Sequence, residues 1–89
     1  MEVQYRKAFL RDLKKLKRQP VYDRIFELAF TTLLEANRLR EVAGVKAMRA
    51  YPNRYRIRIG DYRVGIKVRG DSVEVMRVLH RREFYRYFP

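Results

Sequence analysis

Arginine alternates with Tyr and Ile in the segment from position 54 to position 59. Its three arginines are Arg54, Arg56 and Arg58. In an extended chain, side chains two residues apart lie on one face, about 6.5–7 Å from each other. The guanidinium group is planar, stays charged throughout the physiological pH range, and matches the geometry of phosphate oxygens. The pattern therefore predicts a strand with one face that binds phosphate.

A second strand extends the same face if the Gly60-Asp61 turn makes a tight hairpin. Arg63 and Lys67 alternate with apolar residues there and would face the same side as the first three arginines. Like charges on neighbouring strands repel each other and destabilise a sheet. A solvated sheet face would normally mix Thr, Ser, Glu and Lys. We therefore interpret this face as one that binds an anion.

The segment from His80 to Tyr85 carries a second group of reactive side chains. Its sequence is His-Arg-Arg-Glu-Phe-Tyr, and it follows the last expected strand at the edge of the basic face. A histidine, two arginines and a tyrosine can together bind a phosphate and transfer a proton. On composition alone the signal is weak, because a single tyrosine or histidine more often packs on the core or lies in solvent.

The spacing of hydrophobic residues along the chain predicts the strands and helices that position these side chains. Apolar and polar residues alternate over residues 2–5, as in a short strand. The spacing of apolar residues then changes to that of an amphipathic helix, which ends near Gln19. Pro20 suits the first turn of a second helix that extends to about Asn37. The two helices are expected to form a hairpin with a short connection.

Three strands are expected in the second half of the chain. Residues 39–53 are expected to be irregular, with residues 45–48 as a candidate start of the next strand. The strands then meet at the Gly60-Asp61 and Gly70-Asp71 turns. The last strand, residues 72–80, alternates less cleanly, as in a central strand covered on both faces. Residues 81–89 are expected to be a short tail.

The element order is therefore β-α-α-β-β-β. The fold class is α+β, with a helical hairpin packed on one face of a twisted, largely antiparallel four-stranded sheet. Residues 1–89 are expected to form one domain. The arginines would lie on the sheet face that the hairpin leaves open.

The charge balance favours an anionic partner. The chain has 22 Lys and Arg against 10 Asp and Glu, a net charge of +12, which indicates nucleic acid. It has no cysteine and one histidine, which excludes disulfides, thiolate zinc sites and histidine-rich metal sites, so we expect neither metal nor cofactor. No apolar run approaches the ~20 residues of a membrane span, and no signal core is present. We expect a cytoplasmic protein without a membrane partner.

Two blocks of the sequence resemble the RelE/ParE superfamily of bacterial and archaeal toxins. Residues 55–64 resemble its central block, and residues 80–85 resemble its C-terminal block. The element order and the chain length also agree. The two blocks occur in the right order, and they are more specific for the superfamily than for one branch of it.

The resemblance implies a function. RelE-like members are toxins of type II toxin–antitoxin systems and ribosome-dependent endoribonucleases, or mRNA interferases. They cut mRNA in the decoding site without a metal, by attack of the ribose 2′-hydroxyl on the adjacent phosphate. The resemblance thus implies inhibition of translation, with ribosome and mRNA as partners. It also implies a cognate antitoxin that wraps and blocks the toxin in a hetero-oligomer.

Positions of the family motif transfer to residues of this chain. The implied catalytic residues are Arg56, Arg58, Arg63, Arg81 and Tyr85. The residues expected to bind RNA around them are Arg54, Lys67, His80 and Arg82.

The chain departs from the family at Arg56 and Arg58, where well-studied RelE-like nucleases have lysines. Lysine can release a proton, whereas arginine effectively cannot, so these side chains are expected to orient the RNA and stabilise the phosphorane. Tyr85 is the favoured general base, because surrounding cations favour its phenolate. His80 titrates nearer neutral pH but should project from the opposite face. The choice between Tyr85 and His80 stays open.

Two other functions stay open. ParE-like members share the fold but inhibit DNA gyrase, and they typically lack the full set of basic residues with the tyrosine. A non-catalytic RNA-binding module commonly stacks bases on exposed sheet aromatics. Here Tyr55 and Tyr62 alternate onto the apolar side, and the full set is present. The nuclease is therefore the favoured function.

The second helix has an apolar arc wider than the usual ~100° stripe. Phe30 and Leu34 lie toward the side of this arc that faces away from the sheet. We expect an amphipathic antitoxin helix, or a second copy of the chain, to cover them. The alternative is that residues 39–53 fold over them.

Overall fold

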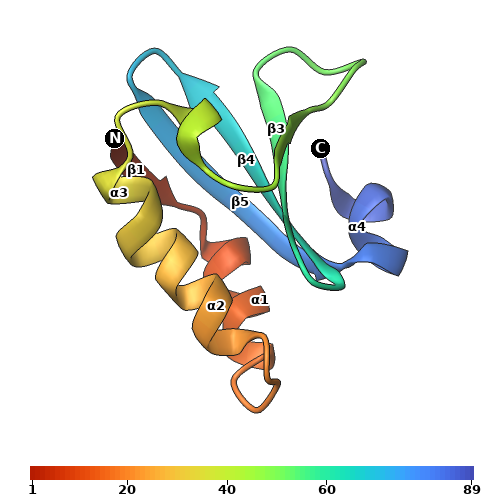
Figure 1. The fold of residues 1–89 in the computed structure, drawn as a ribbon. Coiled ribbons are helices and arrows are strands. Elements are labelled where there is room, and N and C mark those ends of the chain that lie inside the picture. The colour runs from red at the N-terminus through yellow and green to blue at the C-terminus, as the bar shows by residue number, and fades with distance from the viewer.

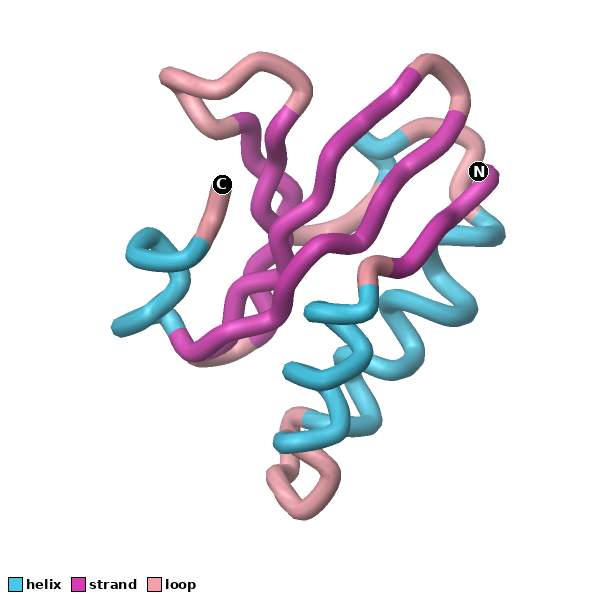
Figure 2. The backbone as a smooth tube through the Cα atoms, turned by 180° about the vertical axis from the view of Figure 1, so that it is seen from behind, coloured by secondary structure: helices cyan, strands magenta, loops and turns pink.

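A five-stranded sheet separates a helical hairpin from a short C-terminal helix (Figures 1 and 2). The structure is a computed structural model that describes residues 1–89. Its elements are β1 (Glu2–Tyr5), α1 (Lys7–Lys15), α2 (Tyr22–Glu27), the π-helical turn η1 (Leu28–Thr32), α3 (Leu33–Glu35), the 3-10 turn η2 (Leu39–Glu41), β2 (Val45–Ala47), β3 (Arg54–Ile59), β4 (Tyr62–Arg69), β5 (Ser72–His80) and α4 (Arg81–Tyr87). None of these helices combines the length and the apolar character needed to cross a membrane.

The strand order is β1-β5-β4-β3-β2. β1 runs parallel to β5, and the other neighbours are antiparallel. The predicted α+β fold with a helical hairpin on a largely antiparallel sheet is confirmed. The sheet has five strands rather than four, because Val45 pairs with Ile57 and Ala47 with Tyr55 as a separate edge strand. Three residues are too few to show a clear alternation in the sequence.

A β-bulge explains the irregular pattern of β5. Gly65 pairs with Arg77 and Ile66 with Val75, so Met76 is the extra residue on β5. A bulge moves the following side chains to the other face. Val75 before the bulge and Val78 after it are therefore both buried on the helical side. β5 is a central strand, as the sequence indicated, but the bulge is what breaks its alternation.

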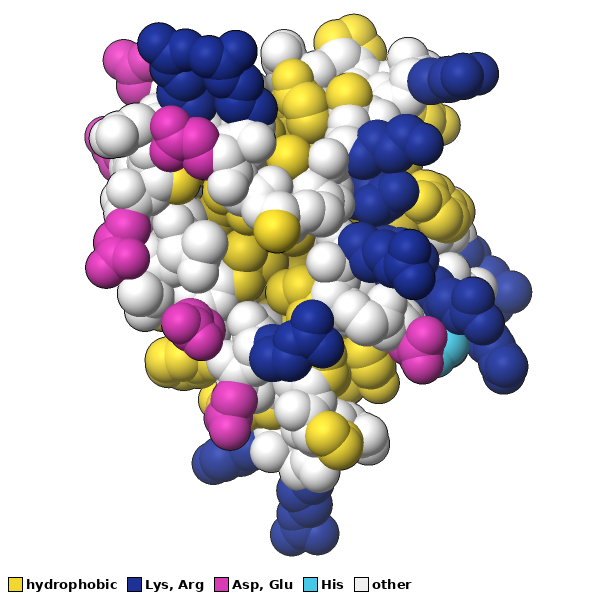
Figure 3. Space-filling model, in the orientation of Figure 1, with side chains coloured by type: hydrophobic (Ala, Val, Ile, Leu, Met, Phe, Trp, Pro, Cys, Tyr) yellow, Lys and Arg dark blue, Asp and Glu magenta, His cyan; other side chains and the backbone are white.

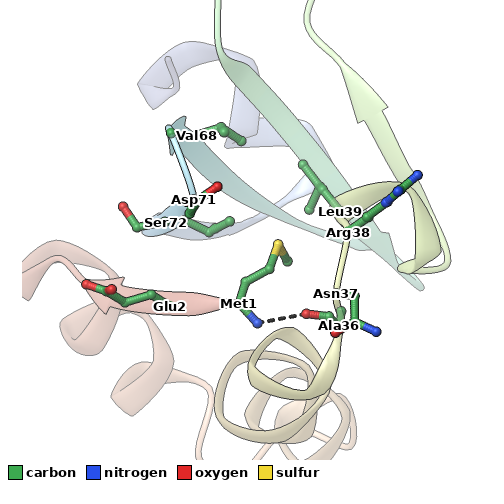
Figure 4. A pocket seen from close by; sticks show the side chains of 11 residues that line it. Met1, Glu2, Ala36, Asn37, Arg38, Leu39, Val68, Asp71 and Ser72 are labelled. Carbon is green, nitrogen blue, oxygen red and sulfur yellow. Dashed lines mark hydrogen bonds between the residues drawn. The ribbon is translucent and has the colours of Figure 1, made fainter.

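The main core lies between the hairpin and the sheet. The second helix is continuous from α2 through η1 to α3, and the Tyr5 hydroxyl donates to the Ala29 carbonyl at 2.6 Å within the π-helical turn. The Met1 amino group donates to the Ala36 carbonyl at 2.7 Å, just past α3 (Figure 4). The fully buried members of this core are Phe9, Ile25, Ala29, Leu33, Ile57, Val64, Ile66 and Val75.

Residues 81–87 form a helix, α4, where a short tail was expected. Phe84 and Phe88 are buried one helical turn apart, with ring centroids separated by 5.2 Å. Phe88 covers Gly65 on the sheet face opposite the main core, and a Cβ atom at position 65 would lie 2.8 Å from its ring. Phe88 thus fixes α4 on the face that carries the arginines.

The outer side of the second helix keeps apolar side chains in solvent. Phe26 is 46% exposed and Leu34 is 48% exposed, whereas Phe30 is half-buried. The Phe30 ring lies 4.6 Å from the rings of Tyr5 and Phe26, measured between centroids. Residues 39–53 therefore do not bury Leu34, and Phe30 is partly buried mainly by its aromatic neighbours.

A buried ion pair joins α1 to the sheet where β1 has ended. Asp12 is buried, and its carboxylate accepts from Arg77 Nε at 2.7 Å and from Arg77 Nη2 at 3.0 Å. It also accepts from the Val78 backbone N–H at 3.1 Å. Hydrogen bonding and the nearby carboxylate raise the pKa of Arg77. Asp12 therefore occupies the edge of β5 that no strand covers.

Asp12→Ala is expected to lower the free energy of unfolding by about 3–5 kcal/mol, because it leaves the partly buried Arg77 and a buried N–H without their acceptor. Urea denaturation measures this loss. Glu83→Ala, at an exposed position, is the control and should change stability by no more than about 0.5 kcal/mol. A loss below about 1 kcal/mol for Asp12→Ala would contradict a structural role for the pair.

Candidate nucleic-acid-binding and catalytic face

The basic face is the sheet face opposite the helical hairpin, and it is defined by its cations on β3 and β4. Arg58 lies directly opposite Arg63, and Arg54 lies directly opposite Lys67. Directly opposed residues have Cβ atoms about 4.5–5.5 Å apart. The fifth cation, Arg56, lies opposite Gly65, where there is no side chain. The two like-charged pairs thus stand on either side of a gap.

Helix α4 occupies this gap. Phe88 lies on Gly65, and one flank of α4 carries Arg81 and Tyr85, which are four residues apart and share a side of the helix. Tyr85 is 61% exposed and lines a groove together with Arg56. The structure therefore brings a phenol to the cation in the middle of the basic face.

Arg63 and Arg81 both contact the turn between β3 and β4. Arg63 Nη1 donates to the Gly60 carbonyl and to the Tyr62 carbonyl, each at 3.1 Å. The Arg81 backbone N–H donates to the Asp61 carbonyl at 2.7 Å. The Arg81 side chain is exposed, and its Nε atom is 3.9 Å from the Asp61 carboxylate. Both guanidinium groups keep donors free for a ligand.

His80 lies apart from this group. It pairs with Tyr62 across β4 and β5, and the two rings are 5.4 Å apart on the hairpin side of the sheet. Its Nδ1 atom accepts from the Arg82 backbone N–H at 3.2 Å and so caps α4. The structure thus places His80 opposite the basic face, as the strand geometry indicated. Arg82 is exposed on the first turn of α4.

Arg54 and Lys67 form the other end of the basic face. Four residues separate Arg54 from Arg58, so the two like-charged pairs are about 13 Å apart along the strand. Arg69 and then Arg54 lower the pKa of Lys67, with partial burial adding to this. The Arg54 Nε atom is buried without a hydrogen-bond partner. The cations at this end therefore lack anionic partners.

The acid nearest to this end is already engaged. Glu74 lies opposite Lys67, but its carboxylate accepts from Arg6 Nε at 2.6 Å. This hydrogen bond is the main reason why the pKa of Glu74 is lowered. Lys and Arg gather mainly on the side of the molecule where β3 and α4 lie, and acids gather over α2 and α3 (Figure 3). The basic face therefore keeps a positive potential.

Part of the candidate site was missed by the sequence reasoning. Residues of β2 and of the segment between β2 and β3 also line the groove beside Arg56 and Tyr85. Lys46 belongs to β2, and Arg49 and Tyr51 belong to the segment. Gly44 and Pro52 had marked this segment as irregular. The available signal was an aromatic residue, Tyr51, two positions after a cation, Arg49.

The sequence matches a family model over residues 3–85, described as the ParE toxin of the type II toxin–antitoxin system parDE. A relative, Toxin RelE3 of Methanocaldococcus jannaschii, is 40% identical over 90 residues that span all of both chains. The chain belongs to the RelE/ParE superfamily. It is a RelE-like toxin of a type II toxin–antitoxin system.

Solved structures of RelE-like toxins have the same fold. The RelB-RelE antitoxin–toxin complex from Methanococcus jannaschii matches with a TM-score of 0.80 and 38% identity, covering 97% of this chain and 99% of that chain. The RelBE2 toxin–antitoxin complex from Mycobacterium tuberculosis matches with a TM-score of 0.70 and 27% identity, covering 89% of this chain and 95% of that chain. Both neighbours were solved as toxin–antitoxin complexes. The predicted membership of the RelE/ParE superfamily is confirmed.

Proposed function

We propose that this RelE-like toxin is a ribosome-dependent, metal-independent endoribonuclease that cuts mRNA in the decoding site and thereby inhibits translation. The observation that carries the proposal is the position of α4. This helix stands on the basic face and brings Tyr85 to Arg56, while its first residue, Arg81, joins Arg63 at the neighbouring turn. A proton acceptor and several phosphate ligands thus share one face.

The chemistry follows from these groups. The ribose 2′-hydroxyl gives its proton to the phenolate oxygen of Tyr85, and the resulting alkoxide forms a bond to the adjacent phosphorus. The bond to the 5′-oxygen breaks, and that oxygen takes a proton from water. The products are a 2′,3′-cyclic phosphate and a new 5′-hydroxyl.

Arginines stabilise the charge that develops during this attack. Arg56 and Arg58 hold the equatorial oxygens of the phosphorane, and fixed cations act most strongly where negative charge is greatest in the transition state. Arg63 and Arg81 bind the scissile phosphate or the leaving oxygen from the turn between β3 and β4. Arginine does not exchange protons here, so the base must be another group.

A ParE-like activity against DNA gyrase is the competing function, because the family model that matches this chain is described as a ParE toxin. The presence of Tyr85 together with the full arginine set favours the nuclease. Translation in vitro followed by primer extension on the message separates the two. Cuts within codons on translated message are expected. Intact message with trapped gyrase–DNA complexes would contradict the proposal.

We also propose that a cognate antitoxin binds this toxin. The structural neighbours described above are toxin–antitoxin complexes. Exposed Phe26 and Leu34, with half-buried Phe30 between them, form an apolar stripe on the side of the second helix that does not face the sheet. Adjacent apolar side chains on the surface of a small protein commonly mark an interaction site. An amphipathic antitoxin helix would bury this stripe.

Binding to ribosomes should weaken steeply with salt. Each of the five cations of the basic face would contact one phosphate and displace counterions from the RNA. With about 0.7 counterions released per phosphate contact on single strands, affinity should fall about 10²-fold between about 50 and 200 mM salt. Titrations with fluorescent toxin measure the slope. Arg58→Ala should reduce this slope by about the contribution of one phosphate contact, whereas Phe26→Ala should leave the slope unchanged. A flat dependence would mean that the basic face does not bind phosphate.

A further inference from the structure

We infer that Tyr51 is a platform on which one base of the bound RNA stacks. This inference rests on the proposed function and adds a substrate contact to it. It arises from the groove between α4 and the segment that joins β2 to β3. The groove has a volume of about 280 Å³, and its lining includes Arg56, Tyr85, Met48 and Tyr51.

The Tyr51 ring is open to a ligand. The side chain is 50% exposed, and its ring has none of the aromatic neighbours that Tyr85 has in Phe84, 5.0 Å away between centroids. A base has an aromatic face whatever its identity, so stacking on tyrosine binds single-stranded RNA with little sequence preference.

Backbone hydrogen bonds hold Tyr51 in place. Its N–H donates to the Met48 carbonyl at 3.2 Å, and its carbonyl accepts from the Arg54 N–H at 3.2 Å. The Met48 N–H donates to the Arg54 carbonyl at 2.9 Å, and the Asn53 carbonyl accepts from the Val68 N–H at 2.9 Å. Asn53 has a φ of 62°, in the left-handed region that asparagine tolerates. A fixed backbone limits the freedom that this segment loses when a base stacks on Tyr51.

The charges of the groove favour RNA over a protein segment. Its ionisable side chains besides the two tyrosines are Lys46, Arg49 and Arg56, and no carboxylate lines it. Because Tyr51 lines the same groove as Arg56, a base attached to a phosphate held by Arg56 can reach the Tyr51 ring. Tyr51 would therefore hold a base close to the phosphate on which Tyr85 acts.

The test uses a short single-stranded RNA that contains 2-aminopurine, whose fluorescence falls on stacking, and 2′-O-methyl groups that prevent cleavage. Tyr51→Ala should weaken binding by about 5- to 150-fold, the range for loss of one stacked base, and should abolish the quenching. Tyr51→Phe should restore both. Leu10→Ala, which removes a comparably exposed apolar side chain from α1, should change neither.

Kinetics on ribosomes separate this role from catalysis. Tyr51→Ala should raise KM for programmed ribosomes and change kcat little, whereas Tyr85→Phe should lower kcat. Wild-type affinity and quenching in Tyr51→Ala would overturn the inference. So would unchanged RNA binding combined with weaker binding of the antitoxin, which would assign the groove to a protein segment. Because the fluorescence assay needs no cleavage, it can succeed even if the proposed nuclease activity fails.

Discussion

Tyr85→Phe is expected to reduce cleavage of ribosome-bound mRNA by about 10²–10⁴-fold, the range for loss of a general base. The substitution removes only the hydroxyl, and the ring can keep its edge contact with Phe84. Affinity for the ribosome should change little, because the arginines supply it. Single-turnover cleavage of a defined message measures the loss.

Two control variants make this result specific. Tyr87→Phe removes a hydroxyl from the same helix on the flank that faces Arg77, and it should cut normally. His80→Asn keeps a side chain that can cap α4, and it should retain most activity. An active Tyr85→Phe with an inactive His80→Asn would reverse the assignment. Normal cleavage by both would mean that arginine electrostatics act without a side-chain base.

Arg81→Ala and Arg63→Ala are each expected to reduce cleavage by at least about 10²-fold, because each removes a donor to charge that grows in the transition state. The Arg81 side chain is exposed, so this change should leave stability intact. Arg63 also contacts two turn carbonyls, and its variant therefore needs an unfolding curve beside the rate.

Arg86→Ala is the matched control for charge. Arg86 is exposed near the end of α4 and makes no ion pair or side-chain hydrogen bond in the structure. Its removal lowers the net charge by the same amount but should affect cleavage only slightly. Near wild-type cleavage by Arg63→Ala or by Arg81→Ala would remove that residue from the proposed site.

The basic face was predictable because strand geometry is strict. Side chains alternate with a period of two, and a tight Gly60-Asp61 turn fixes the register of the two strands. Those two constraints determine that Arg58 meets Arg63 and that Arg54 meets Lys67. The helical hairpin was predictable for a similar reason, because apolar residues recur at a different spacing in its helices than in the strands.

The features that sequence reasoning missed depend on contacts between distant residues. Asp12 and Arg77 are 65 positions apart, and nothing local indicates that they pair. Helix α4 is stabilised by Phe88 packing on Gly65, which becomes evident only once the sheet is formed. Tyr51 lies in a segment without periodicity, so its place in the groove follows from turns rather than from a strand or helix.

The proposed mechanism gives different tasks to different residue types. Arginine fills the two positions where well-studied RelE-like nucleases have lysine, and it cannot release a proton at physiological pH. In the proposed mechanism, positive charge and proton transfer are therefore separated, with charge on the sheet and the phenol on α4. Any displacement of α4 would move Tyr85 and Arg81 and leave the arginines of the sheet in place. The packing of Phe84 and Phe88 thus matters for chemistry as well as for stability.

Cleavage of ribosome-bound message with a single altered sugar tests the central claim most directly. The nucleotide on the 5′ side of the mapped cut carries either ribose or 2′-deoxyribose, and the ends of the fragments are identified by mass spectrometry. We predict that the ribose message is cut to a 2′,3′-cyclic phosphate and a 5′-hydroxyl, and that the deoxyribose message stays intact at that position. Equal cutting of both messages, or fragments with a 5′-phosphate, would contradict attack by the 2′-hydroxyl on the basic face.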